Sequence, residues 1–327
     1  MKMSEITGHE GVKKLLRGII SSGHIGHAYI FEGAEGIGRL SLAKAFAEEL
    51  SGGFSAENNP DIIVVTNELY DPSKKQKNVL IDTVRAMKAD IYIKPYHSDR
   101  KVYIIPNSDT MQEPAQNSLL KIFEEPPEYC TVVLIAANAN ALLQTIRSRA
   151  AMIRIHPLPR KTVEGYLIEK GLADPAHAEV ISAMSGGSIG KAINFSADED
   201  AIALREAVIG HLINICGSGA RPLYDFIKFL KQNNSDISTV IDIMISWSED
   251  IMHLKLCGGY DITNADKAEE LKRICSLVTA EACFRFCDII TKYSLAISRN
   301  ANYSVAVSCM AMEYWEEIHG RNYRSAL

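Results

Sequence analysis

Residues 27–50 read HAYIFEGAEGIGRLSLAKAFAEEL and determine the architecture of the first half of the chain. The apolar run 27–31 predicts a short buried strand, and a glycine-rich turn follows it at 33–38. The turn leads into a segment, 40–50, whose apolar residues share one helical face: Leu42, Ala43, Phe46, Ala47 and Leu50. The order strand, tight turn, helix begins an alternating α/β arrangement.

Three further apolar runs continue this arrangement: DIIVV at 61–65, KVYII at 101–105 and TVVLIAA at 131–137. Runs this continuous are typical of strands in a parallel sheet that helices cover on both faces. Helical patterns lie between them, from 81 and from 117, and the second pattern stops at Pro126 and Pro127. We expect an α/β domain over residues 1–156.

Strand signals stop after the segment IRIHPLP at 153–159. A short helical segment follows Thr162, and the loop SGGSIGK at 185–191 opens another helix. From Ala201 onward the pattern is almost continuously helical, with breaks at 216–222, 231–236 and 257–266. The sequence therefore predicts a small helical domain over 157–200 and a helical C-terminal domain over 201–327.

The overall composition, 327 residues with 47% hydrophobic and 23% charged, is that of a globular protein with two to three domains. A net charge of −5 argues against nucleic-acid binding through overall basicity, although a local basic patch remains open. No apolar run approaches the ~18 residues that a membrane span needs, and the first residues lack the apolar core of a signal peptide. We expect a cytoplasmic protein without membrane contact.

Cysteines and histidines give no metal-binding spacing. The seven cysteines are scattered, and the pair Cys283 and Cys287 has no second pair to complete a zinc site. We expect them to be small buried residues in helices, with neither metal nor disulfide. His24 and His27 lie three residues apart, but no carboxylate or cysteine completes a site, so we interpret them as a loop residue and a packed residue.

The turn GAEGIGRL at 33–40 lies where a phosphate-binding loop would lie, between a buried strand and a helix N-terminus. Gly33 and Gly38 keep the glycine spacing of the pattern GxxxxGK[S/T]. Arg39 replaces the lysine that reaches the phosphates, and Leu40 replaces the hydroxyl that ligates Mg²⁺. We interpret the turn as a phosphate loop that has lost Mg-nucleotide hydrolysis.

A second part of the ATPase site is also altered, namely the acidic residue that holds Mg²⁺. An ATPase of this class holds Mg²⁺ with an acidic residue at the end of a neighbouring strand. Here the strand 101–105 is followed by Pro106 and Asn107, and the nearest carboxylate, Asp109, is displaced from the strand tip. The loss of two parts together argues against chance change at one position.

Residues 101–150, KVYIIPNSDTMQEPAQNSLLKIFEEPPEYCTVVLIAANANALLQTIRSRA, resemble the bacterial clamp-loader branch of the AAA+ proteins over their full length. NSLLKIFEEPP at 117–127 is similar to the family's NALLKTLEEPP, and IRSRA at 146–150 to its SRC segment. GHAYIFEGAEGIG at 26–38 and SGGSIGKAI at 185–193 resemble the family's nucleotide loop and sensor-2 segment. The resemblance is clear over 20–195, and it implies that 157–200 is a lid domain and 201–327 a collar.

Within that family, a lost nucleotide loop beside a retained SR segment resembles the delta-prime subunits of DNA polymerase III. One departure is the interval 51–60, which has none of the four cysteines that often form a zinc module, so no zinc is carried over. The resemblance implies partners: the tau/gamma and delta subunits, and through them the sliding clamp and primer-template DNA. It implies no cofactor in this chain, since ATP and Mg²⁺ would be held by the neighbouring subunits.

The resemblance also implies residue roles. Arg149 would be an arginine finger that acts in trans on a neighbour's ATP, with Arg147 as the second candidate. Asn138 matches sensor 1 and Lys191 matches sensor 2. A degenerate, inactive nucleotide site would then consist of Gly33, Gly36, Gly38, Arg39, Asn138 and Lys191. The plain alternative for Arg149 is an exposed arginine paired with a local carboxylate, and the plain alternative for Lys191 is a solvent-exposed lysine.

Two other functions stay open from the residues alone. One is an AAA+ ATPase that tolerates Arg39 and uses Asp109 for Mg²⁺. The other is a DNA-binding repair module that uses the basic run KKQK at 74–77 with Arg85 and Lys88, although a solvated loop is the commoner meaning of such a run. We assign no chemistry to the EEPP segment at 124–127, which is expected to end a helix and turn the chain.

Overall fold

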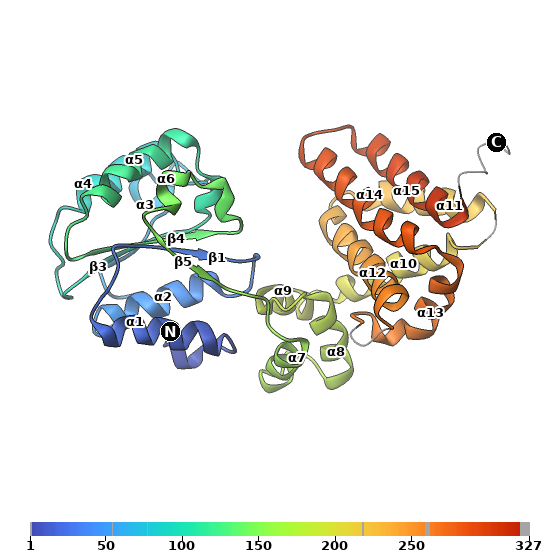
Figure 1. Ribbon diagram of the computed structural model, residues 1–327, viewed down its shortest axis with the longest axis horizontal. Coiled ribbons are helices and arrows are strands. Elements are labelled where there is room, and N and C mark those ends of the chain that lie inside the picture. The colour runs from blue at the N-terminus through green and yellow to red at the C-terminus, as the bar shows by residue number, and fades with distance from the viewer. Residues whose placement is uncertain (1, 54, 77, 218, 259–261, 321–327) are drawn as a thin grey trace. The chain divides into compact units, whose positions relative to one another are not determined.

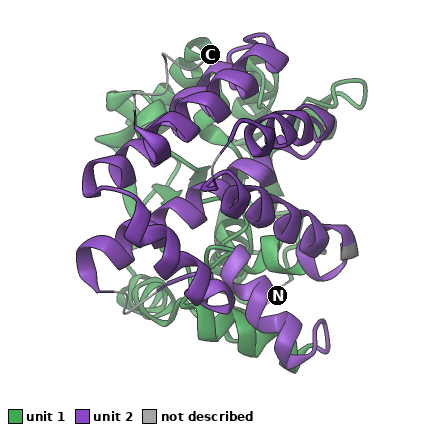
Figure 2. Cartoon of the chain, turned by 90° about the vertical axis from the view of Figure 1, so that its right-hand side faces the viewer, with its two compact units in different colours: residues 1–170, 185–193 green, residues 171–184, 194–327 purple. Residues whose placement is uncertain are grey.

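The computed structural model describes residues 2–53, 55–76, 78–217, 219–258 and 262–320 (Figure 1). The chain divides into two compact units, coloured in Figure 2: residues 1–170 with 185–193, and residues 171–184 with 194–327. These units do not coincide with the three predicted domains, because part of the predicted lid groups with each unit. The boundaries at 156 and 200 therefore stay a prediction.

The first unit contains a five-stranded sheet in the order β2-β3-β4-β1-β5. All of its paired strands are parallel, as the continuous apolar runs predict: β1 (Ala28–Glu32), β2 (Ile62–Val64), β3 (Lys101–Ile105), β4 (Cys130–Ala136) and β5 (Ala151–Arg154). In the register of the central pair, Tyr29 lies opposite Val133. The fold class, an α/β domain followed by helices, is confirmed.

Helices cover both faces of this sheet (Figure 1). The described helical segments of the unit are η1 (Met3–Glu5), α1 (Glu10–Ser22), α2 (Arg39–Leu50), α3 (Asn67–Tyr70), α4 (Ile81–Asp90), η2 (Ser108–Thr110), α5 (Glu113–Glu124), η3 (Ala139–Ala141), α6 (Gln144–Arg147) and α7 (Arg160–Glu169). Tyr29 and Phe31 pack with α1 and α2 on one face, whereas Ile30 packs with α4 and α5 on the other. The predicted apolar face of α2 is buried at all its positions.

Asp61, directly before β2, ties an exposed loop to the sheet. Its fully buried carboxylate accepts hydrogen bonds from the backbone N–H groups of Tyr96 (2.7 Å), His97 (2.7 Å) and Ser98 (2.9 Å). Burial opposes ionisation of this carboxyl, but the hydrogen bonds outweigh burial and hold the pKa of Asp61 below its usual value.

We expect Asp61→Asn to lower the free energy of unfolding by about 1.5–3 kcal/mol near pH 7, because hydrogen bonds to a charged acceptor are lost. The pKa of Asp61 is lower in the folded chain than in the unfolded chain. This stabilisation is therefore complete above the unfolded pKa of about 3.9 and disappears as the pH falls through the folded value. Urea unfolding of both proteins at falling pH checks this. A difference that does not shrink below about pH 4 would contradict it.

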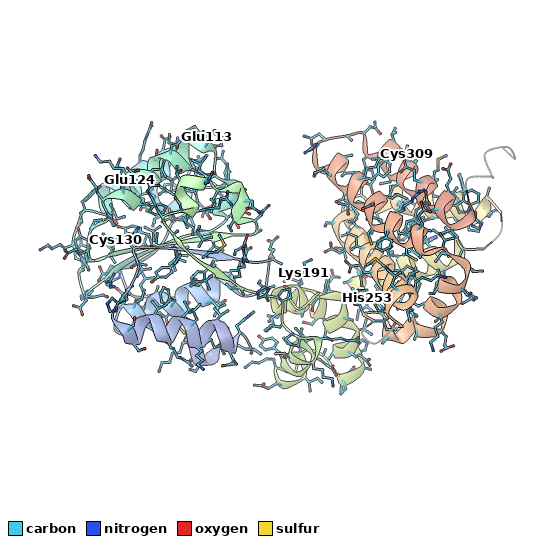
Figure 3. The ribbon with its side chains drawn as sticks, in the orientation of Figure 1. Glu113, Glu124, Cys130, Lys191, His253 and Cys309 are labelled. Atoms are coloured by element: carbon cyan, nitrogen blue, oxygen red, sulfur yellow. The ribbon has the colours of Figure 1, made fainter. Side chains whose placement is uncertain are left out.

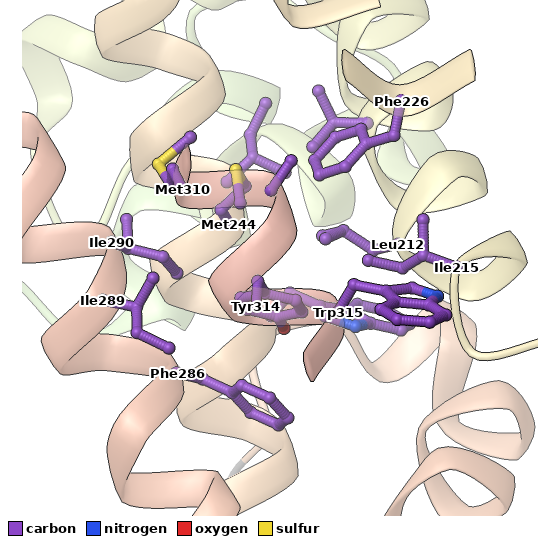
Figure 4. Close-up of a cluster of buried hydrophobic side chains, with 14 of the residues drawn as sticks. Leu212, Ile215, Phe226, Met244, Phe286, Ile289, Ile290, Met310, Tyr314 and Trp315 are labelled. Atoms are coloured by element: carbon purple, nitrogen blue, oxygen red, sulfur yellow. The ribbon is translucent and has the colours of Figure 1, made fainter. Parts of the chain in front are cut away.

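The second unit is helical in its described part. Its segments are α8 (Pro175–Met184), α10 (Glu199–Asn214), α11 (Arg221–Gln232), α12 (Ile237–Cys257), η4 (Ala265–Lys267), α13 (Ala268–Leu277), α14 (Ala280–Ser298) and α15 (Tyr303–His319), while α9 (Ile189–Ser196) begins in the first unit. The core brings Trp247 of α12 together with Phe286, Tyr314 and Trp315 from α14 and α15, several of which Figure 4 labels.

An ion pair with a buried arginine lies beside this core. The side chain of Arg205 in α10 is 1% exposed, and its Nη2 donates to Asp266 Oδ1 (2.7 Å) and to Asn264 Oδ1 (2.7 Å). Its Nη1 donates to Asp266 Oδ2 (3.0 Å) and to Glu206 Oε1 (2.9 Å). Burial opposes ionisation of Asp266, yet the hydrogen bond and charge of Arg205 outweigh burial and lower the pKa of Asp266.

The cysteine prediction is partly wrong. All seven cysteines are free, but only Cys130 and Cys283 are buried, and Cys130 lies in β4 rather than in a helix. Cys257, at the end of α12, is exposed because the helix ends there. Across the described residues, His, Cys, Asp and Glu form no cluster of three that could hold a metal ion. Among the same residues, no helix has both the length and the apolar character needed to cross a membrane.

Candidate functional site

The glycine loop joins β1 to α2, so it lies between a strand and a helix N-terminus as a phosphate loop does. Gly36 has φ +77°, a left-handed conformation that favours glycine, and a Cβ there would lie against Ser188 Oγ. Gly33 has no such constraint on φ, but a Cβ would lie against the carbonyl oxygen of Ile155 after β5. Gly38 then forms the N-cap of α2. Steric fit at Gly33 and Gly36, and the left-handed backbone of Gly38 (φ +96°), therefore account for these glycines without any phosphate.

The segment 185–193 is hydrogen-bonded to this loop within the first unit. The backbone N–H of Gly190 donates to Gly36 O (2.9 Å), and Ser188 Oγ donates to Glu35 O (3.3 Å). Ser188 Oγ also accepts from the backbone N–H of Lys191 (3.1 Å), so the hydroxyl joins the loop to the start of α9. Lys191, labelled in Figure 3, is partly buried at the start of α9.

A small cavity of about 240 Å³ adjoins the loop on the side of the N-terminal segment. Its lining is mostly apolar and includes Ile37, Tyr166, Ile189 and Ile193. His9 also lines it, and its Nε2 lies 2.8 Å from the carbonyl oxygen of Ile37. Burial lowers the pKa of His9, while the Ile37 carbonyl partly opposes this, so His9 is neutral near pH 7. His9 thus contacts the loop at Ile37.

Arg39, which stands where a phosphate loop has lysine, is 8% exposed. Its Nη1 is buried and has no hydrogen-bond partner among the described residues. Burial lowers the pKa of the Arg39 guanidinium, and the nearby charges of Asp109 and Glu35 oppose that effect. Arginine stays protonated at neutral pH, so a positive charge is retained at this position.

The residues around Arg39 do not fit bound Mg²⁺. Leu40 offers no oxygen, and its position at the first turn of α2 is where a hydroxyl ligand would be needed. One oxygen of the Asp109 carboxylate, Oδ2, already accepts from the backbone N–H groups of Ala137 (2.9 Å) and Asn138 (3.1 Å). Asp109 therefore stabilises the end of β4, and we derive no metal-dependent step at this loop.

Asn138 follows β4 at the position of sensor 1. Its side-chain oxygen accepts from the backbone N–H of Asn140 (2.9 Å) and so caps η3. Asn140 in turn accepts a hydrogen bond from Arg147 Nη1 (2.8 Å), while Arg147 Nε is buried without a partner among the described residues. The structure thus places Asn138 and Arg147 in one short chain of local contacts and does not bring Asn138 into the cavity beside the glycine loop.

Arg149 lies in the turn between α6 and β5, and its side chain is 37% exposed. Its Nη1 donates to the carbonyl oxygen of Thr145 (3.1 Å), and its Nη2 donates to Glu124 Oε1 (3.1 Å). The alternative reading, an exposed arginine paired with a local carboxylate, therefore describes a contact that is present. That contact leaves most of the guanidinium donors available to a partner.

Two residues of this region are missing from the sequence predictions. Glu124, labelled in Figure 3, belongs to the EEPP segment, to which we assign no chemistry, yet it contacts the candidate finger. The family motif that contains it was the available signal. His9 carries no local signal, because its contact with Ile37 joins residues 28 positions apart.

Two cations of the basic loop, Lys74 and Arg85, have acidic neighbours. Lys74 lies 3.3 Å from Asp82 and 3.8 Å from Asp71, and Arg85 lies 3.5 Å from Asp82. Lys77, the last residue of the KKQK run, lies outside the described residues. His24 is exposed, and its Nδ1 lies 2.9 Å from Ser22 O. His27 Nε2 is buried without a hydrogen-bond partner in the described part of the chain.

Comparison with known proteins identifies relatives of this chain. Residues 8–159 match the family model described as DNA polymerase III, delta subunit. DNA polymerase III subunit delta' of Bacillus subtilis (strain 168) is 31% identical over 213 residues, which cover 61% of this chain and 62% of that protein. Subunit tau of the same organism is 25% identical over 326 residues, covering 89% of this chain and 57% of that protein.

A solved structure of a DNA polymerase III gamma subunit-related protein from Thermotoga maritima has a TM-score of 0.48 and 18% identity, covering 94% of this chain and 99% of that one. The chain spans about three fifths of the length of the two Bacillus relatives. The matched family model lies on the unit that carries the glycine loop, Arg149 and the parallel sheet. The chain is therefore similar, over residues 8–159 above all, to subunits of DNA polymerase III.

Proposed function

We propose that this chain is a non-catalytic, delta-prime-type subunit of a bacterial DNA polymerase III clamp loader, acting in DNA replication in the cytoplasm. It would present Arg149 to the ATP of a neighbouring tau/gamma subunit and provide a rigid scaffold. The observation that carries the proposal is the combination of an exposed, oriented Arg149 with a glycine loop whose residues do not fit Mg²⁺. A guanidinium suits this role because it donates several hydrogen bonds to the charge that develops on the transferred phosphoryl group.

The helical second unit would supply the collar that joins the tau/gamma and delta subunits. Neighbouring subunits would bind ATP and Mg²⁺ and use them to open the sliding clamp and load it on primer-template DNA. Nothing in this role requires the present chain to hold nucleotide at Gly33, Gly36, Gly38, Arg39, Asn138 and Lys191.

Assembly tests the proposal most directly. The chain, mixed with tau/gamma and delta from the same organism, should elute as one complex in size-exclusion chromatography. Adding clamp and primed DNA should then stimulate ATP hydrolysis by that complex beyond hydrolysis by tau/gamma and delta alone. If the wild-type chain does not assemble, the proposed partners are wrong.

We expect the isolated chain to release no phosphate from ATP above the buffer background. Leu40 has no oxygen for Mg²⁺, and Asp109 is committed to two backbone amides, so Arg39→Lys alone should not restore hydrolysis. A phosphate-release assay on both proteins checks this. Hydrolysis that Arg39→Ala abolishes would instead favour an ATPase with a divergent loop.

A further inference from the structure

The position of Glu124 is unusual for a carboxylate. It is the last residue of α5, where the helix dipole disfavours negative charge, and Glu125 follows it as the C-cap. Helix stability therefore gives no reason for an acidic residue here. The described contact of the Glu124 side chain is with Arg149, 25 residues further along the chain. This contact gives the carboxylate a specific partner.

The two hydrogen bonds of Arg149 fix the plane of its guanidinium. Thr145 O holds Nη1 and Glu124 Oε1 holds Nη2, each at 3.1 Å. Because arginine has five N–H donors, these bonds leave three for another molecule. The pair is open to solvent, with exposed fractions of 37% for Arg149 and 52% for Glu124. An exposed pair of this kind is weak, so it orients the arginine without preventing it from binding a phosphate.

We propose that Glu124 is a positioning residue that holds Arg149 ready for the ATP of the neighbouring subunit. This inference rests on the proposed function of Arg149. A long arginine side chain loses rotamer freedom when it binds, and holding it in place beforehand removes part of that cost. The effect should appear in the rate of the chemical step rather than in the affinity of the neighbour for ATP.

Chemical modification tests the contact in the isolated chain. Phenylglyoxal reacts with accessible, unpaired guanidinium groups, and peptide mass spectrometry can follow Arg149 alone. Glu124→Ala should increase the modification rate of Arg149. Glu125→Ala is the matched control, because Glu125 is exposed, adjacent and equally charged, and it should leave the rate unchanged. Equal rates in wild type and Glu124→Ala would overturn the inference.

A double-mutant cycle tests the function in the assembled complex with tau/gamma and delta. Glu124→Ala should lower kcat for ATP hydrolysis by about two- to fivefold with KM unchanged, and Glu124→Gln, which keeps an acceptor oxygen, should recover part of the loss. In an Arg149→Ala background, Glu124→Ala should have no further effect. An unchanged or increased kcat, or the same loss in both backgrounds, would overturn the positioning role.

The cycle separates this inference from the proposed function. If Arg149→Ala lowers kcat and Glu124→Ala does not, the finger stands and only the role of Glu124 is wrong. If Arg149→Ala leaves kcat unchanged in an intact complex, the finger is wrong and the positioning role is overturned with it. Size-exclusion chromatography of each variant ensures that rates are compared for equal amounts of complex.

Discussion

Arg149→Ala should lower ATP hydrolysis by the complex with tau/gamma and delta at least tenfold, measured with clamp and primed DNA present. Arginine fingers contribute ~10³–10⁵ to the rate of phosphoryl transfer, so a tenfold loss is a lower bound. The complex should still form, because Arg149 is exposed and its contact with Glu124 is a weak surface pair. The expected defect is therefore in the chemical step alone.

Arg154→Ala is a matched control for this experiment. Arg154 lies five residues further on at the end of β5, its side chain is 70% exposed, and it also pairs with one glutamate, Glu32, at 3.3 Å. Its removal should leave the ATPase rate unchanged. If Arg149→Ala also leaves the rate unchanged, the mechanism proposed here is wrong, and Arg147 becomes the next residue to replace.

Arg205→Met should lower the free energy of unfolding of the second unit by about 3–5 kcal/mol. Methionine fills much of the same space, but it leaves the carboxylate of Asp266 and the side-chain oxygen of Asn264 without their donor. Asp266 is partly buried, so its charge loses both its partner and part of its hydration. The cost comes mainly from these lost hydrogen bonds and the lost ion pair rather than from lost packing.

Tryptophan fluorescence during urea unfolding measures this change cleanly. The chain has two tryptophans, Trp247 and Trp315, and both lie in the core of the second unit. Arg221→Ala is the control, because the Arg221 side chain is 87% exposed and pairs with Asp225 at 3.2 Å on the surface. That variant should lose no more than about 1 kcal/mol. Similar losses in the two variants would contradict a buried ion-pair role for Arg205.

The sheet and the glycine loop could be predicted because their signals are local. Strands buried on both faces are continuous apolar runs, and the run 101–105 coincides with β3. The prolines at 126 and 127 ended the predicted helix within two residues of its observed end at Glu124. The cysteine prediction was partly wrong because burial depends on which element covers a residue, as Cys130 and Cys257 illustrate.

The contacts that make up the candidate site could not be predicted in the same way. Asp109 was a possible metal ligand by position in the sequence, and only the fold shows that two amides after β4 donate to one oxygen of its carboxylate. The pairing of Glu124 with Arg149 depends on the end of α5 lying beside the turn that precedes β5. The family resemblance assigned roles to single residues such as Arg149, but it did not indicate which neighbouring side chains contact those residues.

The contact between Gly36 and Gly190 has a mechanical consequence. A loop that receives phosphate offers its backbone N–H groups to the ligand. In this chain the carbonyl oxygens of Glu35 and Gly36 already accept hydrogen bonds from Ser188 and Gly190. The two segments are therefore joined without any ligand between them. The contact therefore serves as a structural connection between the glycine loop and the start of α9, with no need for nucleotide.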